Sequence, residues 1–306
     1  MDEKLGQALK HVPQLASADP GSLKVARQGG LTNLVYRIDH GPERYILRLP
    51  GEGTEAYIDR EVEIHNARAA ARAGISAEVL FADETTGLML TRFIDGIVTM
   101  TPKLFGEREG SPARAGKVLK RLHGSGETFR FRFELFAMID EYLGHVDKLG
   151  AALPHGYHDV VAKAGAIREV LERNPGGLAP CHCDPLCENF LDDGAVMWLV
   201  DWEYSGMNDP IWDLGDLSVE AGFTAAQDTE MMFAYCGGEP PAALAGRMVI
   251  YKAACDLLWT LWGLIQHANG NPAEDFWAYA TGRFERCRAL MATVEFRRAL
   301  AAINGG

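Results

Sequence analysis

One short stretch of the chain carries most of the side chains that could do chemistry. Asp184 and Asn189 lie five residues apart, and Asp201 follows a short apolar run, Trp198 to Val200, that is typical of a buried strand. Phosphoryl transfer requires a carboxylate that orients the attacking hydroxyl, and oxygen ligands that hold Mg²⁺ on a nucleotide. Because Mg²⁺ prefers hard oxygen donors and takes few protein carboxylates, Asn189 and Asp201 suffice as its ligands. The spacing therefore predicts a site for phosphoryl transfer.

The same stretch allows two other interpretations. A single Asp in a loop most often closes a turn or caps a helix, although three polar residues beside Phe190-Leu191 and a buried strand form a more specific pattern. Cys181, Cys183 and Cys187 could instead bind zinc. Their spacing lacks the two separated pairs of a structural zinc site, and we therefore expect them to be small buried residues.

Length, composition and charge restrict the class of protein. The 306 residues suggest about two domains, and 47% apolar with 24% charged residues is ordinary for a globular protein. A formal net charge of −12 argues against a nucleic-acid partner and against attachment to an anionic membrane. The chain has no uncharged apolar run of transmembrane length and no signal-peptide core, so we expect a cytoplasmic protein without a membrane span.

The first ninety-odd residues predict a small, mostly antiparallel sheet that carries one helix. Runs of strand composition alternate with turns rich in Gly, Pro and Asp. An opening amphipathic helix covers residues 3–11, and the helix on the sheet covers residues 59–73 and ends at Gly74. The expected strands are residues 23–27, 34–38, 45–49, 78–82 and 88–93.

The second part of the chain predicts a larger, mostly helical lobe. Ser111 is expected as an N-cap with Pro112 at the first helical position. A non-helical island, residues 178–212, contains the candidate site. We place the boundary between residues 1–93 and residues 94–306. The expected helices are residues 113–123, 135–149 and 160–173 and the helical stretch 242–303.

The candidate site resembles that of a known superfamily. His182, Asp184 and Asn189 match the H-x-D-x₄-N catalytic loop of the kinase-like phosphotransferases, and Asp201 matches their metal-binding Asp. Aminoglycoside phosphotransferases share this loop. The resemblance implies that Asp184 positions the substrate hydroxyl and accepts its proton, that Asn189 and Asp201 hold Mg²⁺, and that His182 braces the loop.

A longer run is similar to one family within that superfamily. Residues 200–208, continuing to Asp213 and Glu220, resemble the choline/ethanolamine kinase family, most of all its bacterial, LicA-like branch. The similarity extends to residues 29–33 and 45–49 and covers essentially the whole chain. It implies an α+β, two-lobed protein-kinase-like fold, with a small antiparallel-sheet N-lobe that carries one helix and a larger, mostly helical C-lobe. It also implies ATP and Mg²⁺ as cofactors.

The resemblance assigns nucleotide-binding residues in the first lobe. Arg48 occupies the strand position where protein kinases use Lys, and it can grip phosphate oxygens through two donors. Glu63 on the following helix is its expected partner, with Glu61 as the competing choice. A glycine-rich turn would approach the phosphates, and a connector would present its backbone to the adenine. The residues of the turn and of the connector are Gly29, Gly30, Thr32 and Asn33, and Arg92, Phe93 and Ile94.

Two tryptophans indicate where the acceptor would bind. Trp259 and Trp262 are three residues apart, which places both on one face of a helix, either as part of the core or as the wall of a pocket. The resemblance implies a pocket wall, to which Phe276, Tyr279 and Glu220 also contribute. A quaternary ammonium cannot donate a conventional hydrogen bond, so aromatic faces and nearby negative charge bind it.

Together these features predict a kinase that phosphorylates the hydroxyl of choline. Three departures from the family pattern, Cys183, Asp216 and Phe276, bear on the choice of amine. The alternatives are the same reaction on ethanolamine, thiamine or an aminoglycoside, and a nonenzymatic choline-binding pseudokinase. A protein kinase is disfavoured, because no Ala-Pro-Glu sequence follows Asp201.

Overall fold

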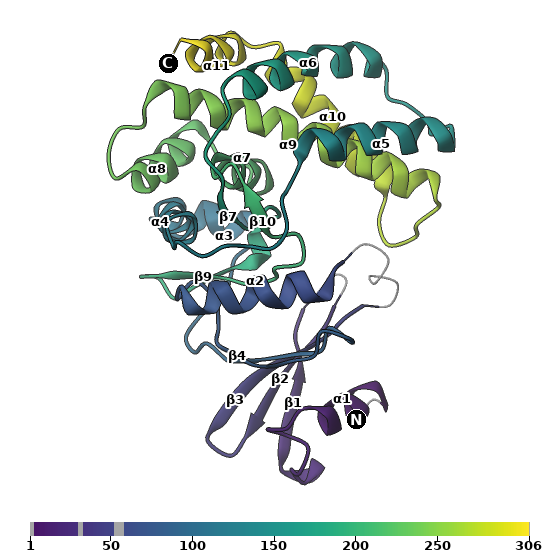
Figure 1. The fold of residues 1–306 in the computed structure, drawn as a ribbon, viewed down its shortest axis with the longest axis vertical. Coiled ribbons are helices and arrows are strands. Elements are labelled where there is room, and N and C mark those ends of the chain that lie inside the picture. Colours follow the sequence, from purple (N-terminus) through teal and green to yellow (C-terminus); the bar gives the residue numbers. More distant parts are fainter. Residues whose placement is uncertain (1–2, 30–32, 52–57, 306) are drawn as a thin grey trace.

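The protein has a sheet-rich part and a larger helical part. The computed structural model describes residues 3–29, 33–51 and 58–305. Figure 1 shows the sheet at one end, the helices at the other, and α2 (Arg60–Arg72) between them. The predicted two-lobed α+β architecture with a small antiparallel sheet is confirmed. The exact boundary at residues 93 and 94 stays a prediction.

The N-terminal lobe is built on a five-stranded antiparallel sheet with the strand order β1-β2-β3-β5-β4. Alternate residues of the central strands, such as Ile38 and Leu47, are fully buried, as a half-covered sheet requires. α1 (Glu3–His11) contributes Leu5 and Leu9 to the same core. A short 3₁₀ turn, Pro20–Ser22, precedes the sheet. The strands are β1 (Leu23–Arg27), β2 (Leu34–His40), β3 (Glu43–Leu49), β4 (Val79–Ala82) and β5 (Met89–Arg92).

α2 joins the two lobes. The side chain of Asp59 caps its N-terminus by accepting the N–H of Val62 at 3.1 Å, and Gly74 ends the turn after it with a φ of 68°. Ile64 and Ala70 on α2 pack into the hydrophobic core of the helical lobe. A helix predicted to lie on the sheet therefore also anchors the sheet to the C-terminal lobe.

The C-terminal lobe contains nine helices within the described residues. The sequence predicted α4, α5, α6 and the helical final stretch, but not α3, α7 or α8. The predicted cap was wrong by one residue, because α4 begins at Ser111 and its N-cap is Gly110, while the Ser111 hydroxyl donates to the Phe105 carbonyl at 3.0 Å. The helices are α3 (Pro102–Glu107), α4 (Ser111–His123), α5 (Leu135–Leu149), α6 (Tyr157–Arg173), α7 (Ile211–Glu220), α8 (Ala225–Cys236), α9 (Ala242–Ala268), α10 (Phe276–Met291) and α11 (Val294–Asn304).

Short strands form the island between α6 and α7. β6 (Val98–Thr99), β8 (Phe190–Asp192) and β9 (Met197–Leu199) make a three-stranded antiparallel sheet. β7 (Ala179–Cys181) pairs with β10 (Gly206–Asn208). The candidate catalytic residues lie in the turns that leave β7 and β9, so these short pairings set their positions.

α9 is the long central helix of the C-terminal lobe. Among the described helices it alone has the length and composition of a membrane span, and 78% of its apolar window is buried inside the protein. Such burial is typical of a core helix that is apolar on every side. α9 packs against α5, α7, α10 and α11 and carries both tryptophans of the predicted acceptor pocket.

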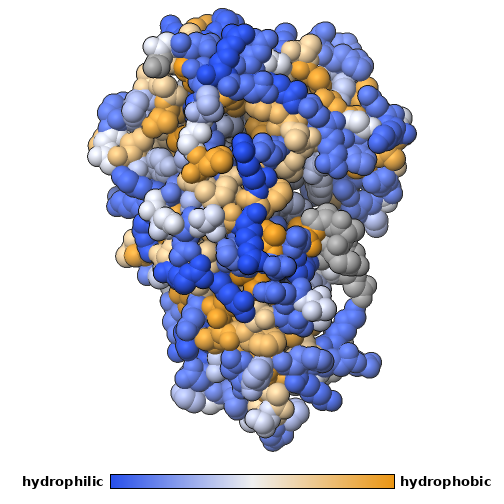
Figure 2. Space-filling view, in the orientation of Figure 1, coloured by the Kyte–Doolittle hydropathy of each residue, from blue (hydrophilic) through white to orange (hydrophobic). Residues whose placement is uncertain are grey.

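The surface and the interior differ as expected for a globular chain. Figure 2 shows hydrophilic side chains over most of one face, with hydrophobic residues in small groups among them.

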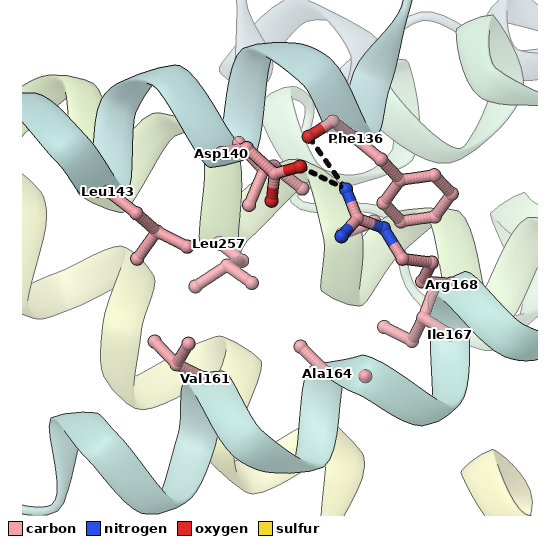
Figure 3. Close-up of a pocket in the computed structure, with 11 residues that line it drawn as sticks. Phe136, Asp140, Leu143, Val161, Ala164, Ile167, Arg168 and Leu257 are labelled. Carbon is pink, nitrogen blue, oxygen red and sulfur yellow. Dashed lines mark hydrogen bonds and ion pairs between the residues drawn. The ribbon is translucent and has the colours of Figure 1, made fainter.

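A cavity of about 140 Å³ remains between α5, α6 and α9, where Val161, Ala164 and Leu257 face one another (Figure 3). At one side of it Arg168 pairs with Asp140 at 2.6 Å.

Candidate active site

The loop that precedes Asp184 is held in a strained conformation by a buried carboxylate. The backbone N–H groups of His182 and Cys183 donate to the two oxygens of Asp213, at 2.7 and 2.9 Å. Cys183 has a φ of 67°, in the left-handed region that costs a non-glycine residue about 1–2 kcal/mol. The indole N–H of Trp212 also donates to the Cys183 carbonyl, at 3.1 Å. These bonds determine how the chain enters Asp184.

Asp184, Asn189 and Asp201 belong to one hydrogen-bonded unit. The side-chain amide of Asn189 donates to the backbone carbonyl of Asp184 at 3.1 Å, and Val200 donates its N–H to the Asn189 carbonyl at 3.0 Å. Nε2 of His182 lies 2.9 Å from the Val200 carbonyl, so this ring links the loop to the residue before Asp201. The structure thus brings the three residues of the predicted catalytic site together.

Five charged side chains form what we call the interlobe ion-pair network. Arg48 of β3 pairs with Glu63 of α2 and, at 3.2 Å, with Asp201. Arg60 at the start of α2 lies 2.7 Å from Glu63 and 2.7 Å from Glu203. Asp201 is 37% exposed, and the other four side chains are buried or nearly so. Because buried charges must be paired, this network fixes β3 and α2 against the strand that leads to Asp201.

The geometry of α2 decides which glutamate meets Arg48. Glu63 is fully buried and faces Arg48, whereas Glu61 is exposed and pairs with Arg130. Residues two apart on a helix do not share a face, so only one of the two can reach β3. Glu63 is therefore the partner of Arg48.

The site carries an excess of negative charge. Burial and the charges of Glu220 and Asp201 raise the pKa of Asp184 to about 8. Partial burial and the charges of Glu203 and Glu63 also raise the pKa of Asp201, although the guanidinium of Arg48 opposes this shift. Both shifts have the sign expected where carboxylates share a buried site with too few cations. A cation bound among these acids would favour their ionised forms.

The donor set fits a magnesium ion. Asn189 offers an amide oxygen, and Asp201 offers a carboxylate that solvent can reach. Oxygen atoms of Glu63, Asp201 and Glu203 lie within 4.8 Å of one another, so three carboxylates of the interlobe network face only two arginines. Hard oxygen donors with surplus negative charge suit Mg²⁺, and Asn189 and Asp201 would hold it.

Part of the predicted phosphate-binding turn, Gly30 and Thr32, lies outside the described residues. Gly29 is exposed at the end of the described segment. Asn33 is buried, and its side-chain amide donates to Glu203 at 3.1 Å. The structure therefore ties Asn33 to the interlobe network, and the contacts of the turn with a nucleotide stay a prediction.

The predicted adenine connector follows β5. The side chain of Arg92 is exposed and pairs at 3.0 Å with both Glu43 and Glu78. Phe93 and Ile94 are half-buried. The Arg92 side chain is thus occupied on the outside of the sheet, and the role of the connector backbone stays a prediction.

Five aromatic side chains form what we call the aromatic cluster: Tyr204, Trp259, Trp262, Phe276 and Tyr279. The ring of Trp262 lies 5.3 Å from that of Phe276 and 5.7 Å from that of Tyr279, both nearly perpendicular to it. Trp259 lies 6.1 Å from Trp262 on one side and 6.3 Å from Tyr204 on the other. Because Tyr204 comes from the segment after β9, the cluster begins beside the catalytic residues.

Arg283 connects the aromatic cluster to acidic side chains. Its buried guanidinium lies over the Tyr279 ring, 4.6 Å from the centroid. It pairs with Glu220 and, at 3.5 Å, with Asp256. Glu220, predicted to attract the amine, therefore already has a cationic partner. An ammonium group bound here would share Glu220 with Arg283.

Asp216 is a second buried acid beside Glu220. The Cys255 thiol donates to one oxygen of Asp216 at 3.0 Å, and the other oxygen has no hydrogen-bond partner in the described part of the chain. Burial and the charges of Glu220 and Asp184 raise the pKa of Asp216 well above its ordinary value. Burial and the neighbouring negative charges thus favour the protonated form of Asp216.

The three cysteines near the catalytic loop are buried thiols, as their spacing predicted. Cys181, Cys183 and Cys187 are free and almost completely buried. Burial raises the pKa of each thiol above its ordinary value. In the described part of the chain, no group of converging potential metal ligands contains more than one of these three cysteines, so they are poorly placed to share a zinc ion.

Known proteins are similar to this chain in sequence and in fold. A sequence profile described as "Phosphotransferase enzyme family" matches residues 25–245. The crystal structure of a choline/ethanolamine kinase family protein from Mesorhizobium loti is 58% identical, has a TM-score of 0.92, and is aligned over 99% of each chain. This chain belongs to the choline/ethanolamine kinase family of phosphotransferases. The resemblance inferred from the catalytic loop is thereby confirmed.

Relatives of this family member differ in their named substrates. The crystal structure of choline kinase LicA from Streptococcus pneumoniae is 26% identical, has a TM-score of 0.74, and is aligned over 94% of this chain and 98% of its own. Ethanolamine kinase 2 of Mus musculus is 25% identical over 318 residues, which cover 93% of this chain and 81% of that protein. Family membership therefore leaves the choice between the two amines to the site itself.

Sequence reasoning assigned no role to four residues that shape the site of this family member. Arg60 lies one helical turn before Glu63, a spacing that favours an ion pair, so a charge search along the helix could have found it. Glu203 and Tyr204 lie in the run 200–208 that carried the family resemblance, but no local pattern revealed their distant partners. The same is true of Arg283.

Proposed function

We propose that this protein is an ATP- and Mg²⁺-dependent kinase that phosphorylates the hydroxyl of choline to give phosphocholine. The observation that carries the proposal is the position of the aromatic cluster, which begins at Tyr204 beside the catalytic residues and ends at Arg283 and Glu220. An amino alcohol has a hydroxyl and an ammonium group only two carbons apart. A carboxylate beside a cluster of rings matches both ends of such a molecule.

Asp184 orients the acceptor hydroxyl in this proposal. Its backbone is held by the strained loop, and its carboxylate accepts a hydrogen bond from the hydroxyl and takes the proton late in the reaction. Mg²⁺, when bound by Asn189 and Asp201, neutralises charge that develops on the transferred phosphoryl group. Arg48 is already oriented by Glu63 and presents a charged fork to phosphate oxygens.

The aromatic cluster binds the cationic end of the acceptor. A trimethylammonium group presents no N–H, so the faces of Trp259, Trp262 and Tyr279 contribute about 0.5–2 kcal/mol per cation–π contact once water is excluded. The Glu220–Arg283 pair keeps the local charge close to neutral and thus supplies only a weak field. Recognition therefore depends mainly on the rings, which favours the quaternary amine.

A coupled ADP-release assay with a panel of hydroxylated amines tests the proposal. Choline is expected to have the highest kcat/KM among choline, ethanolamine, thiamine and an aminoglycoside. Asp184→Asn should abolish turnover with all of them, whereas Asp159→Asn on the exposed face of α6 should keep wild-type kinetics. An active Asp184→Asn enzyme would refute the assigned mechanism.

Ethanolamine is the second candidate, and one observation favours it. The buried oxygen of Asp216 that has no partner in the described structure lies near Glu220, and a primary ammonium could donate N–H bonds to such acids. A clear advantage of ethanolamine over choline in the panel would support this alternative and contradict recognition by the rings. Choline binding in calorimetry without affinity for ATP and Mg²⁺ would instead indicate a nonenzymatic binding protein.

A further inference from the structure

We propose that the cavity between α5, α6 and α9 is a binding site for a small, neutral aromatic alcohol, of which phenol is the simplest. The apolar wall of the cavity takes the ring, and the guanidinium of Arg168 donates to the hydroxyl oxygen. The site lies apart from the candidate catalytic residues, and the inference does not rest on the proposed function. A guest held there acts on the stability of the helical lobe and not on the chemistry.

Small side chains on two helices leave this space open. Ala164 and Gly165 of α6 and Ala254 of α9 line it, and a Cβ at Gly165 would meet nothing within 4 Å. Larger apolar side chains, among them Leu143 and Leu257, surround the rest (Figure 3). Apolar atoms beside empty space lack the dispersion contacts that packing would give them, so a guest that fills the space is favoured. Gly165 is exposed, which leaves a way in from solvent.

The volume of the cavity limits the guest to about one ring. At about 140 Å³ it is close in size to the ~150 Å³ of an engineered apolar cavity that binds benzene. A nucleotide or a helix of a partner protein is much larger, so the space suits neither. The apolar lining favours a guest whose body carries no charge and few polar atoms.

One polar group, the guanidinium of Arg168, lies at the edge of the cavity. It lies over the Phe136 ring, 5.0 Å from the centroid. In the described part of the chain its hydrogen bonds leave from Nη2 alone, at 2.9 Å to the Phe136 carbonyl and 2.6 Å to Asp140. Nε is buried, and the carboxylate of Glu172 lies 3.6 Å from it, beyond hydrogen-bond distance. In Figure 3 the other terminal nitrogen is turned to the side of the cavity. Arg168 thus has N–H donors left for a guest.

The charges around Arg168 favour a neutral guest. Asp140 and Glu172 lie 2.6 and 3.6 Å from its guanidinium, so two carboxylates face one cation. An anionic guest would meet this surplus negative charge, and a cationic guest would lose its hydration in an apolar cavity. A hydroxyl group avoids both costs. Its oxygen accepts an N–H from Arg168, and its own proton can be donated to Asp140.

The cavity and the aromatic cluster lie on different faces of α9. Ala254 and Leu257 are three residues apart and share the face that lines the cavity. Trp259 comes two residues after Leu257, about 200° around the helix, and Trp262 lies on the same side as Trp259. A guest in the cavity should therefore stabilise the fold without contacting the acceptor. Its failure to bind would leave the proposed function untouched.

Binding can be measured by thermal unfolding and by calorimetry of the full chain with phenol, benzene, benzoate and benzylamine. Ala164→Leu fills the cavity, and Ala162→Leu, on the exposed face of the same helix, is the matched control. Arg168→Met removes the donors and keeps an unbranched apolar stem. The kcat and the KM for choline are recorded with and without phenol, because a phenol that bound to the aromatic cluster would compete with choline.

We expect phenol to raise the unfolding temperature and to bind about tenfold more tightly than benzene, which is the effect of one hydrogen bond, and to bind more tightly than either charged ring. Ala164→Leu should weaken phenol binding by about tenfold or more, Ala162→Leu should equal wild type, and Arg168→Met should bind phenol no better than benzene. The kinetics for choline should not change.

Four results would overturn the proposal: phenol binding that survives Ala164→Leu, equal affinities of wild type for phenol and benzene, a preference for benzoate or benzylamine, or competition between phenol and choline. If Ala164→Leu does not fold, the comparison of phenol with benzene in wild type and in Arg168→Met still decides. A wild-type protein that binds phenol as expected but is inactive on choline would refute the proposed function alone.

Discussion

The proposed nucleotide side and the proposed acceptor side of the site are built by different physical means. On the nucleotide side, the interlobe ion-pair network joins β3, α2 and the segment after β9 through charge. On the acceptor side, four of the five rings come from α9 and α10 of one lobe, and Arg283 supplies a buried positive charge. Buried ion pairs are directional and costly to break, whereas ring faces are tolerant of orientation. The first side should therefore be far more sensitive to single substitutions.

Glu63→Gln should have the largest effect, because it leaves Arg48 and Arg60 with less buried negative charge. Removal of one partner of a buried ion pair costs about 3–5 kcal/mol, so we expect the free energy of unfolding to fall by about 3 kcal/mol. We also expect the KM for ATP to rise. Urea unfolding and steady-state kinetics measure both. Glu61→Gln on the exposed face of the same helix is the control and should change stability by about 0.5 kcal/mol or less. Similar effects of the two substitutions would contradict the contrast drawn here.

Asp216→Asn tests the uncompensated acid on the acceptor side. The raised pKa of Asp216 means that the folded protein keeps a proton which the unfolded chain releases above about pH 4. Folding stability attributable to Asp216 is therefore lost as the pH rises from there toward the folded pKa. The substitution removes this dependence, so the stability of the variant relative to wild type should rise with pH.

Thermal unfolding of both proteins between about pH 5 and pH 8 measures this difference. The stability difference between Asp216→Asn and wild type should grow with pH. The difference between wild type and Asp159→Asn, on the exposed face of α6, should not change with pH. A variant that is less stable than wild type at every pH would show that Asp216 is an ionised, paired carboxylate.

Trp262→Leu tests whether the rings recognise the cation. The loss of one cation–π contact of about 0.5–2 kcal/mol should raise the KM for choline about 2- to 30-fold, with a smaller change for ethanolamine, which can donate N–H bonds. Trp277→Leu is the control, because Trp277 packs on His267 outside the aromatic cluster. An equal rise of KM for both amines would mean that Trp262 serves packing alone.

A pair of glycine substitutions should have the smallest effects. A Cβ at Gly263 on α9 would come within 2.8 Å of the Tyr279 ring, so Gly263→Ala should displace this ring and weaken choline binding a few-fold. A Cβ at Gly165 on α6 would meet nothing within 4 Å, and Gly165 lines the cavity between α5, α6 and α9. Gly165→Ala should therefore stabilise the protein by about 0.5–1 kcal/mol, measured by urea unfolding, at unchanged kinetics. If Gly165→Ala weakened choline binding or lowered stability while Gly263→Ala changed neither, the tight contact would lie at α6 and not at α9.

Local patterns were sufficient to predict the regular elements. α1, β1 and α5 have the predicted bounds, because the periodic apolar positions that indicate each element lie within its own segment. α7 was missed because its first two residues were assigned to the non-helical island, residues 178–212, and only a short run remained in which to recognise a helix. Short helices such as α3 also offer few residues in which a period can appear.

The sequence by itself indicated the family and the candidate catalytic residues. Asp184 and Asn189 lie on one loop and Asp201 follows the next hairpin, so their spacing along the chain already implied their proximity. The same holds for Trp259 and Trp262, which one helix carries on one face. Contacts within a loop or a helix are fixed by local geometry, which the spacing of residues along the chain predicts.

Only the tertiary structure decided which distant side chains support that constellation. Arg60 meets Glu203 across 143 positions and His123 meets Asp213 across 90 positions, and no local pattern couples such pairs. The choice of Glu63 over Glu61 likewise required knowing which face of α2 turns toward β3. Buried charges accept whichever partners the packed chain brings within reach, so their pairing follows from the fold and not from the spacing of residues.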